Sequence, residues 1–372
     1  MLCEAKTLRG FFYLTLTNFF GDCPFYFDDV TDNAVLKRIA RLPRMDASAT
    51  RDSVINDLKK IAPLAAQTRT SDNKGARLGA ACAYMVIAKC AMWNKEWTVA
   101  LDALKELENI YGDFSQYDLE ENVMFRNKNT PESIMELQHI YVQGGLQYTS
   151  NLACICTPSR KKVGGVALFD GVEIPELGDQ GTIWSSARPN VFFCQGLQTK
   201  LGKDKRKSLN MAWEYDGKEF NSVNTRPWMG PKFWCPYMQS SHDGNNYKIF
   251  RYADAILMMA ECYNELGEDA KSVEYLNKTR NRAGLPDYTY RTSARLQDEI
   301  RNERGRELFG EFQRKFDLVR WGIWYQSIQD YSDYQALKDN AVACREYYPI
   351  PDKEVVYSGY ALDNEEYKRY GL

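Results

Sequence analysis

The chain has 372 residues, which is enough to bury a large hydrophobic core. Its net charge of −2, with both signs spread along the sequence, leaves no broad basic field and excludes nucleic acid as the expected partner. No run of about eighteen apolar residues occurs, which excludes a transmembrane helix. Aromatic residues make up 13% of the chain, and tyrosine and tryptophan suit contacts with sugars or proteins because they join an apolar face to a polar group.

The N-terminal part, residues 1–111, shows helical periodicity. Apolar residues recur every three or four positions in four segments, which cover residues 3–20, 48–67, 75–91 and 97–111. Small residues line the third segment, so the fourth can pack closely against it. The last two segments therefore predict a helical hairpin of the tetratricopeptide type.

Helical periodicity disappears between residues 112 and 247, where glycine and proline recur too often for long elements. Aromatic residues persist there, and an irregular region between regular helices is where binding groups are expected. We predict ligand contacts at the residues Trp184, Arg188, Asn190, Trp213 and Trp228. An indole face can stack on the C–H face of a sugar ring, while arginine and asparagine hydrogen-bond its hydroxyl groups.

The C-terminal part, residues 248–372, returns to helical spacing. A second helix pair is predicted over residues 253–263 and 270–280. One long helix follows over residues 298–322, with an apolar core face at Leu308, Phe312, Phe316, Val319 and Ile323. A second stripe, on which glutamates alternate with arginines, predicts a structural ion network. Two prolines within residues 348–351 then impose an extended segment.

Several motifs resemble those of the SusD/RagB family of bacterial outer-membrane nutrient-binding lipoproteins. The most specific lies in the predicted long helix and comprises Glu303, Arg304, Glu307, Leu308, Phe312, Arg314, Asp317, Leu318, Arg320, Trp321 and Gly322. Further similar segments are EAKTLRGFFYLTLTNFFGDCPF at residues 4–25, RYADAILMMAECYNELG at residues 251–267, and YPIP at residues 348–351. Weaker similarities to the family's motifs are the pair Asp204 and Arg206 and the pair Lys232 and Phe233.

The resemblance implies a mainly α fold, a single domain over residues 1–372 in which tetratricopeptide-like helix pairs form a scaffold for an irregular, loop-rich binding face. It implies a protein of the outer-membrane cell surface that binds an oligosaccharide or another nutrient and delivers it to a SusC-like TonB-dependent transporter. Complete family members carry a lipid anchor, and the absence of a leader before Cys3 leads us to expect an N-terminally truncated member.

The motif residues Glu303, Arg304, Glu307, Arg314, Asp317, Arg320 and Trp321 are expected to be structural. One alternative is a glycoside hydrolase that uses Glu303 and Glu307 as its carboxylate pair, but the adjacent arginines favour an ion network. The chain also lacks the common catalytic motifs, so we expect no enzyme and no cofactor. A second alternative, a helical-repeat scaffold for protein partners, is disfavoured because the irregular region separates the helix pairs.

A metal site is not expected either. Cys154 and Cys156 form the only close cysteine pair, and His139 and His242 are the only histidines. The aspartates of residues 28–32 miss the spacing of a calcium loop and are better explained by a solvated turn.

Overall fold

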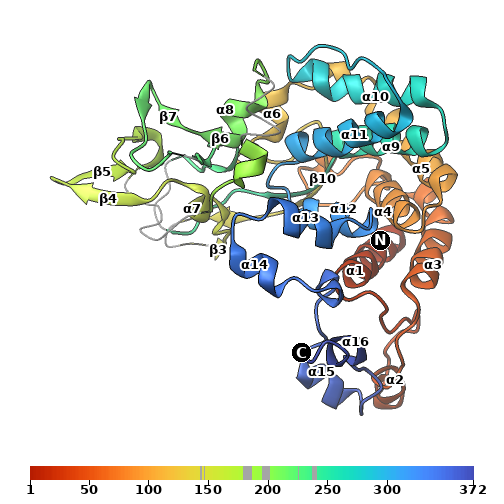
Figure 1. Cartoon of the computed structure of the whole chain (residues 1–372). Helices are drawn as coiled ribbons and strands as arrows, with labels where there is room; N and C mark the ends of the chain where they lie inside the picture. The colour runs from red at the N-terminus through yellow and green to blue at the C-terminus, as the bar shows by residue number, and fades with distance from the viewer. Residues whose placement is uncertain (143–144, 146, 179–186, 195–201, 225, 237–240) are drawn as a thin grey trace. The chain divides into compact units, whose positions relative to one another are not determined.

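The computed structural model describes residues 1–372 except 143–144, 146, 179–186, 195–201, 225 and 237–240 (Figure 1). Contacts group the chain into unit 1, residues 1–66, 82–103 and 313–372, and unit 2, residues 67–81 and 104–312. These boundaries differ from the predicted parts 1–111, 112–247 and 248–372, and a single domain stays a prediction. Helix is the main secondary structure of the described residues, which confirms the predicted mainly α fold. None of the described helices has both the length and the apolar character needed to cross a membrane.

Unit 1 is helical. Its helices are α1 (Leu2–Phe20), α2 (Asn33–Ile39), α3 (Ala47–Lys59), most of α4 (Ala80–Trp93), the start of α5 (Trp97–Tyr111), α12 (Arg314–Arg320), α13 (Trp324–Tyr331), α14 (Gln335–Asn340), α15 (Asp352–Tyr357) and α16 (Glu365–Lys368). The Asp46 side chain caps α3 by accepting a hydrogen bond from the backbone N–H of Ala49 at 2.9 Å. Helix α3 ends at Lys59 and not near residue 67; residues Ala62–Leu64 form a separate 3₁₀ turn, in which Pro63 has no N–H to continue the α-helical hydrogen bonds.

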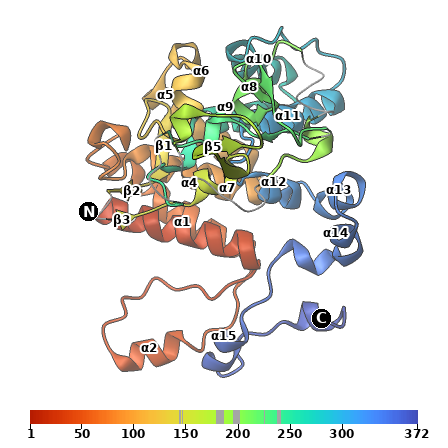
Figure 2. The ribbon, with the colours of Figure 1, turned by 90° about the vertical axis from the view of Figure 1, so that its left-hand side faces the viewer.

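Helix α1, which Figure 2 shows leading from the N-terminus, packs against α3. A Cβ atom on Gly10 would lie 3.0 Å from the side chains of both Val54 and Leu58, so glycine permits the close approach. The spacing of Leu8, Phe12 and Leu16 correctly predicts the helix, but these side chains are 38%, 58% and 39% exposed. The buried face of α1 carries smaller and more polar residues, which are Thr7, Gly10, Tyr13, Leu14, Thr17 and Asn18.

The extended segment predicted at residues 348–351 lies against the end of α1. The backbone N–H of Tyr348 donates to the carbonyl oxygen of Phe19 at 2.7 Å. The Phe19 ring also packs edge-on against Phe316 of α12, with centroids 5.2 Å apart. An N-terminal helix and a C-terminal segment are thus in contact within unit 1.

Unit 2 combines three long helices with short elements. Its helices include the end of α5, α6 (Leu119–Val123), α7 (Leu152–Cys156), α8 (Arg206–Asn210), α9 (Tyr252–Glu265), α10 (Asp269–Arg282) and α11 (Ser293–Glu307). The predicted pair α9 and α10 turns at Gly267, whose φ of +78° is accessible to glycine. The Ser272 hydroxyl donates to the carbonyl oxygen of Ala260 at 2.6 Å and ties the pair together.

The strands of unit 2 form two-stranded antiparallel sheets. They are β1 (Ser133–Leu137) with β10 (Tyr247–Arg251), β2 (Ile140–Tyr141) with β3 (Gln147–Tyr148), β4 (Arg160–Val163) with β5 (Val166–Phe169), β6 (Met211–Ala212) with β9 (Trp228–Met229), and β7 (Glu214–Tyr215) with β8 (Lys218–Glu219). Their shortness agrees with the frequent glycine and proline residues of this region.

The predicted long helix over residues 298–322 is wrong, because the chain breaks between α11 and α12. Gly310 and Phe312 have φ values of +71° and +56°, which no α-helix accommodates. Tertiary contacts replace the lost helical hydrogen bonds: Arg251 donates to the carbonyl oxygen of Glu307 at 2.6 Å, and Lys232 to that of Phe309 at 2.9 Å. Phe312, predicted on the core face, is 62% exposed.

The break in the helix predicts that any side chain at Gly310 lowers the stability of the fold. A Cβ there would lie 2.3 Å from Cζ of the fully buried Phe233, and the positive φ adds backbone strain. We expect Gly310→Ala to lower the free energy of unfolding by about 2–4 kcal/mol in urea denaturation. Gly164→Ala is the control, because its φ is also positive but nothing lies within 4 Å. Equal losses in the two variants would contradict the steric argument.

Candidate functional site

The interior of unit 2 contains charged side chains where hydrophobic ones are usual. We define the ionic core as Asp204, Arg206, Glu132, Lys232, Arg251, Arg282, Glu303, Arg306, Glu307 and Glu311, all of which are buried or nearly so. These residues come from segments far apart in the sequence, including α8, β10, α10 and α11. The cations balance the carboxylates, as burial of charge requires.

Three arginines converge on Glu307. Its Oε1 lies 2.7 Å from Arg251 Nη1 and 2.6 Å from Arg282 Nη2, and its Oε2 lies 2.9 Å from Arg206 Nη1. Glu303 sits one helical turn earlier, 2.7 Å from Arg206 and 2.9 Å from Arg306. The face of α11 that carries the glutamates is therefore a buried face.

These arginines determine the protonation state of both glutamates. Burial alone would raise the pKa of Glu303, but Arg206 and Arg306 lower it to about 2. At Glu307 burial is likewise outweighed, by Arg282, Arg251 and Arg206, and its pKa falls well below the usual range. A general acid in glycoside hydrolysis needs a raised pKa, so this environment opposes a catalytic role for the pair.

The ionic core also positions two short elements that carry surface residues. Arg206 is the first residue of α8 and Asp204 lies two residues before it; their side chains are joined by an ion pair of 2.8 Å. The Asn210 amide at the end of α8 donates to the carbonyl oxygen of Arg306 at 3.0 Å. Lys232 anchors the 3₁₀ turn Pro231–Phe233 through Glu311 at 2.7 Å. The weaker family-like sequence pairs around residues 204 and 232 thus hold the neighbouring backbone against α11 and the residues that follow it.

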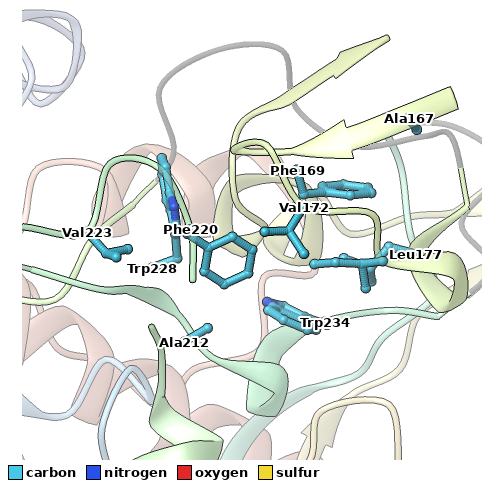
Figure 3. Close-up of a cluster of buried hydrophobic side chains, with 10 residues drawn as sticks. Ala167, Phe169, Val172, Leu177, Ala212, Phe220, Val223, Trp228 and Trp234 are labelled. Carbon is cyan, nitrogen blue, oxygen red and sulfur yellow. The ribbon is translucent and has the colours of Figure 1, made fainter. Parts of the chain in front are cut away.

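A hydrophobic cluster supports the same region from another direction. Figure 3 shows buried side chains from β5, β6, β9 and the intervening segments meeting in one group. The cluster comprises Ala167, Phe169, Val172, Ile174, Leu177, Ala212, Phe220, Val223, Trp228 and Trp234, with Trp213 and Tyr215 packed against it in half-buried positions. Trp213 and Tyr215 therefore rest on a fixed base and keep part of their surface open.

The prediction of a ligand contact at Trp228 is wrong. Trp228 is 3% exposed, and its Nε1 donates to Asp170 at 2.8 Å. The Arg188 guanidinium lies 3.6 Å above its ring centroid, while the same group donates to Ser222. Trp228 has no free face for a sugar because it is a core residue of β9, and Arg188 covers it.

The structure contains a pocket of about 650 Å³ beside Trp213. Its wall consists of residues from α8, β6, β7 and the turn at Pro231. We define the Trp213 pocket by its lining residues Gly202, Lys203, Asp204, Lys207, Ser208, Met211, Ala212, Trp213, Glu214, Tyr215, Asp216, Pro231 and Trp234. The ionic core holds α8 on one side of this pocket, and the hydrophobic cluster holds β6 and Trp234 on the other.

The hairpin β7–β8 brings a second aromatic residue, Tyr215, to the pocket. Its turn residues Asp216 and Gly217 have φ values of +50° and +73°, as a two-residue turn with an Asp-Gly sequence prefers. The Tyr215 ring centroid lies 6.3 Å from that of Trp234. Tyr215 and the polar residues of the pocket were not predicted as contacts, although the Asp-Gly pair marks the hairpin in the sequence.

Two further predicted contacts that the structure describes, Arg188 and Asn190, do not line this pocket. Trp184 lies outside the described residues. Asn190 is half-buried, and its side chain accepts a hydrogen bond from the backbone N–H of Phe193 at 3.2 Å. Of the four predicted ligand residues that the structure describes, only Trp213 lines the pocket.

The second half of the sequence motif forms a local cluster in unit 1. Arg320 pairs with Asp317 at 2.9 Å, and the guanidinium groups of Arg320 and Arg314 lie 4.9 and 5.5 Å from the ring centroid of Trp321. Arg304, in unit 2, is buried and lies 2.9 Å from Asp254 of α9. These contacts orient helices, and the residues that make them do not line the Trp213 pocket.

No cluster of three or more His, Cys, Asp or Glu side chains suited to a metal occurs among the described residues. The aspartates of residues 28–32 make local contacts: Asp32 caps α2 by accepting from Ala34 and Val35, and Asp28 pairs with Arg38 at 3.2 Å. Burial raises the pKa of the Cys156 thiol to about 12, which keeps the thiol protonated at neutral pH.

Comparison with known proteins supports the family resemblance. The sequence profile of the SusD family matches residues 198–367. SusD-like protein P25 of Formosa agariphila is 27% identical, and the alignment covers 98% of this chain and 72% of that protein.

Solved structures share the fold. A SusD homologue from Bacteroides thetaiotaomicron has a TM-score of 0.76 at 19% identity, over 96% of this chain and 77% of that one. Surface glycan-binding protein A from Bacteroides uniformis has a TM-score of 0.71 at 24% identity, over 97% and 76%. Surface glycan-binding protein A from Bacteroides thetaiotaomicron, solved with laminarihexaose, has a TM-score of 0.70 at 21% identity, over 97% and 77%. The family profile over residues 198–367, the relative of nearly full coverage and the motif residues agree in supporting the SusD family for this chain, and the solved structures show the shared fold.

Proposed function

We propose that this chain binds an oligosaccharide in the Trp213 pocket. The observation that carries the proposal is the pair of half-buried aromatic side chains, Trp213 and Tyr215, on a rigid base in a chain of the SusD family. Aromatic faces stack on sugar C–H groups, while Lys207, Ser208 and Glu214 supply donors and acceptors for hydroxyl groups. The related surface glycan-binding protein solved with laminarihexaose supports a glycan as the ligand.

The test is calorimetry with a panel of oligosaccharides that begins with laminarihexaose. We expect Trp213→Ala to raise Kd about tenfold for a glycan that the unaltered chain binds, because one stacking ring contributes about 1.4 kcal/mol. Tyr357→Ala on α15 removes a ring that is 73% exposed and serves as the control with unchanged affinity. Equal binding by a folded Trp213→Ala variant would remove the pocket from the proposal, and no binding to any glycan would contradict the function.

The proposal includes delivery of the bound glycan to a SusC-like TonB-dependent transporter at the outer-membrane surface, without cleavage. Family membership supports delivery, and the ion pairing of Glu303 and Glu307 supports the absence of hydrolysis. Co-purification with a transporter encoded by a neighbouring gene tests the first point. Release of reducing sugar that Glu303→Gln abolishes would contradict the second.

A further inference from the structure

A second pocket of unit 2, about 530 Å³ in volume, opens along helix α10, and the proposed glycan site does not include it. We define the α10 pocket by its lining residues, all polar or charged, which are Asp113, Ser115, Glu274, Asn277, Lys278, Asn281, Arg282 and Asp287. The five that belong to α10 follow one another at steps of three, one, three and one residues, so they share one face of the helix. The volume suits a small polar ligand or a few units of a longer chain.

The lining of the α10 pocket has unused hydrogen-bonding groups of both kinds. Glu274, Asn281 and Asp287 make no side-chain hydrogen bond or ion pair with any residue that the structure describes. The side-chain carbonyl oxygen of Asn277 accepts from the backbone N–H of Tyr288 at 2.8 Å, which leaves its NH₂ group as a donor. A hydroxyl group both donates and accepts, so a ligand with several hydroxyl groups matches the carboxylates and the amides together.

The charges of the α10 pocket favour a neutral ligand. Lys278 lies 3.3 Å from Glu108, and Arg282 lies 2.6 Å from both Glu132 and Glu307. An anionic ligand would therefore meet unpaired carboxylates, while the described cations of the lining already have partners. An ammonium group only donates, so it could not use the amide donors. Hydroxyl groups without charge fit the lining best.

The α10 pocket lies next to the Trp213 pocket. A Cβ on Gly284 would lie 3.7 Å from the carbonyl oxygen of Lys203, which lines the Trp213 pocket, and 3.4 Å from Cε of Lys205. Gly284 is three residues from both Asn281 and Asp287 of the α10 pocket, and three residues span at most about 11 Å. The turn at Gly284 therefore separates the two linings by less than the length of an extended hexasaccharide.

We propose that the α10 pocket continues the Trp213 pocket, so that one neutral oligosaccharide chain occupies both. The aromatic rings of the Trp213 pocket stack on one end of the chain, and the polar side chains of α10 hydrogen-bond the sugar units at the other end. The inference rests on the proposed function, because the Trp213 pocket is the first half of the site. It adds a requirement for length, since a glycan confined to the Trp213 pocket makes no hydrogen bonds in the second pocket.

The test is calorimetry with laminarihexaose and laminaribiose, or with the hexamer and dimer of whichever glycan in the panel binds. We expect the unaltered chain to bind the hexamer more tightly than the dimer. The pair Glu274→Ala and Asn281→Ala should weaken binding of the hexamer about tenfold and leave the dimer unchanged, because only the hexamer reaches α10. Both side chains are exposed, so this double variant should fold normally. Trp213→Ala should weaken binding of both glycans.

The matched control is Glu106→Ala with Asn109→Ala, which removes the same two kinds of exposed side chain from α5, outside both pockets. It should bind both glycans as the unaltered chain does. Hexamer binding that Trp213→Ala weakens and the Glu274 and Asn281 changes do not would overturn the inference and leave the proposed function standing. Equal weakening of dimer and hexamer by those two changes would overturn it as well. Binding of no glycan by the unaltered chain would contradict the proposed function and this inference with it.

Discussion

Replacing Glu307 by alanine should lower the free energy of unfolding by about 3–5 kcal/mol, the largest effect we expect from one substitution. Glu307 is fully buried and partly neutralises the charges of Arg206, Arg251 and Arg282, each of which lies within 3 Å of its carboxylate. Without Glu307, these arginines keep their charge in the interior and lose a partner. The free-energy cost of removing their charges from water is then no longer offset.

Urea denaturation followed by circular dichroism measures this loss. The control is Glu268→Ala, which removes an exposed carboxylate paired with the exposed Lys271 and should change stability by less than about 1 kcal/mol. Glu303→Ala should destabilise in the same way by about 3 kcal/mol, since Arg206 and Arg306 then lose a shared partner. An unchanged denaturation midpoint for Glu307→Ala would show that the ionic core does not hold α11 in place.

Acid should unfold the protein through the same carboxylates. The pKa of Glu303 is about 2 in the folded chain and about 4.5 in the unfolded chain. The unfolded state therefore binds the proton more readily, so the stability contributed by Glu303 is complete above pH 4.5 and is lost as pH falls towards 2. The difference corresponds to about 3 kcal/mol from this group. The depressed pKa values of Glu307 and Glu132 act in the same direction.

The measurement is the free energy of unfolding at intervals between pH 2 and 6, for the unaltered chain and for Glu303→Gln. The variant cannot titrate at residue 303, so it should be less stable at pH 6 but should lose less stability on acidification. The slope of its free energy of unfolding against pH should be smaller by the equivalent of about one proton. Glu268→Gln should keep the slope of the unaltered chain. Parallel curves for the Glu303→Gln variant and the unaltered chain would contradict the depressed pKa.

Local sequence patterns were enough to predict the helices that form unit 2's scaffold. The pair α9 and α10 follows from apolar spacing interrupted by Gly267, and both signals act over a few residues. The change to short elements after residue 112 follows from glycine and proline, which restrict backbone conformation wherever they occur. The motif residues likewise indicated the family, because an ordered set of side chains is a property of sequence alone.

Only the tertiary structure decided which faces of these elements are buried. Glu303 and Glu307 of α11 are interior because Arg206, Arg251 and Arg282 arrive from other segments and neutralise them. The same is true of the tryptophans: Trp228 pairs with β6 and is covered by Arg188, whereas Trp213 stays partly open beside its pocket. Periodicity in a sequence reports which residues share a face, but burial depends on partners that lie tens or hundreds of residues away. For this reason the sequence by itself determined the helix pair α9–α10 and the family motifs, and the packing of the chain determined the break after α11, the ionic core and the pocket.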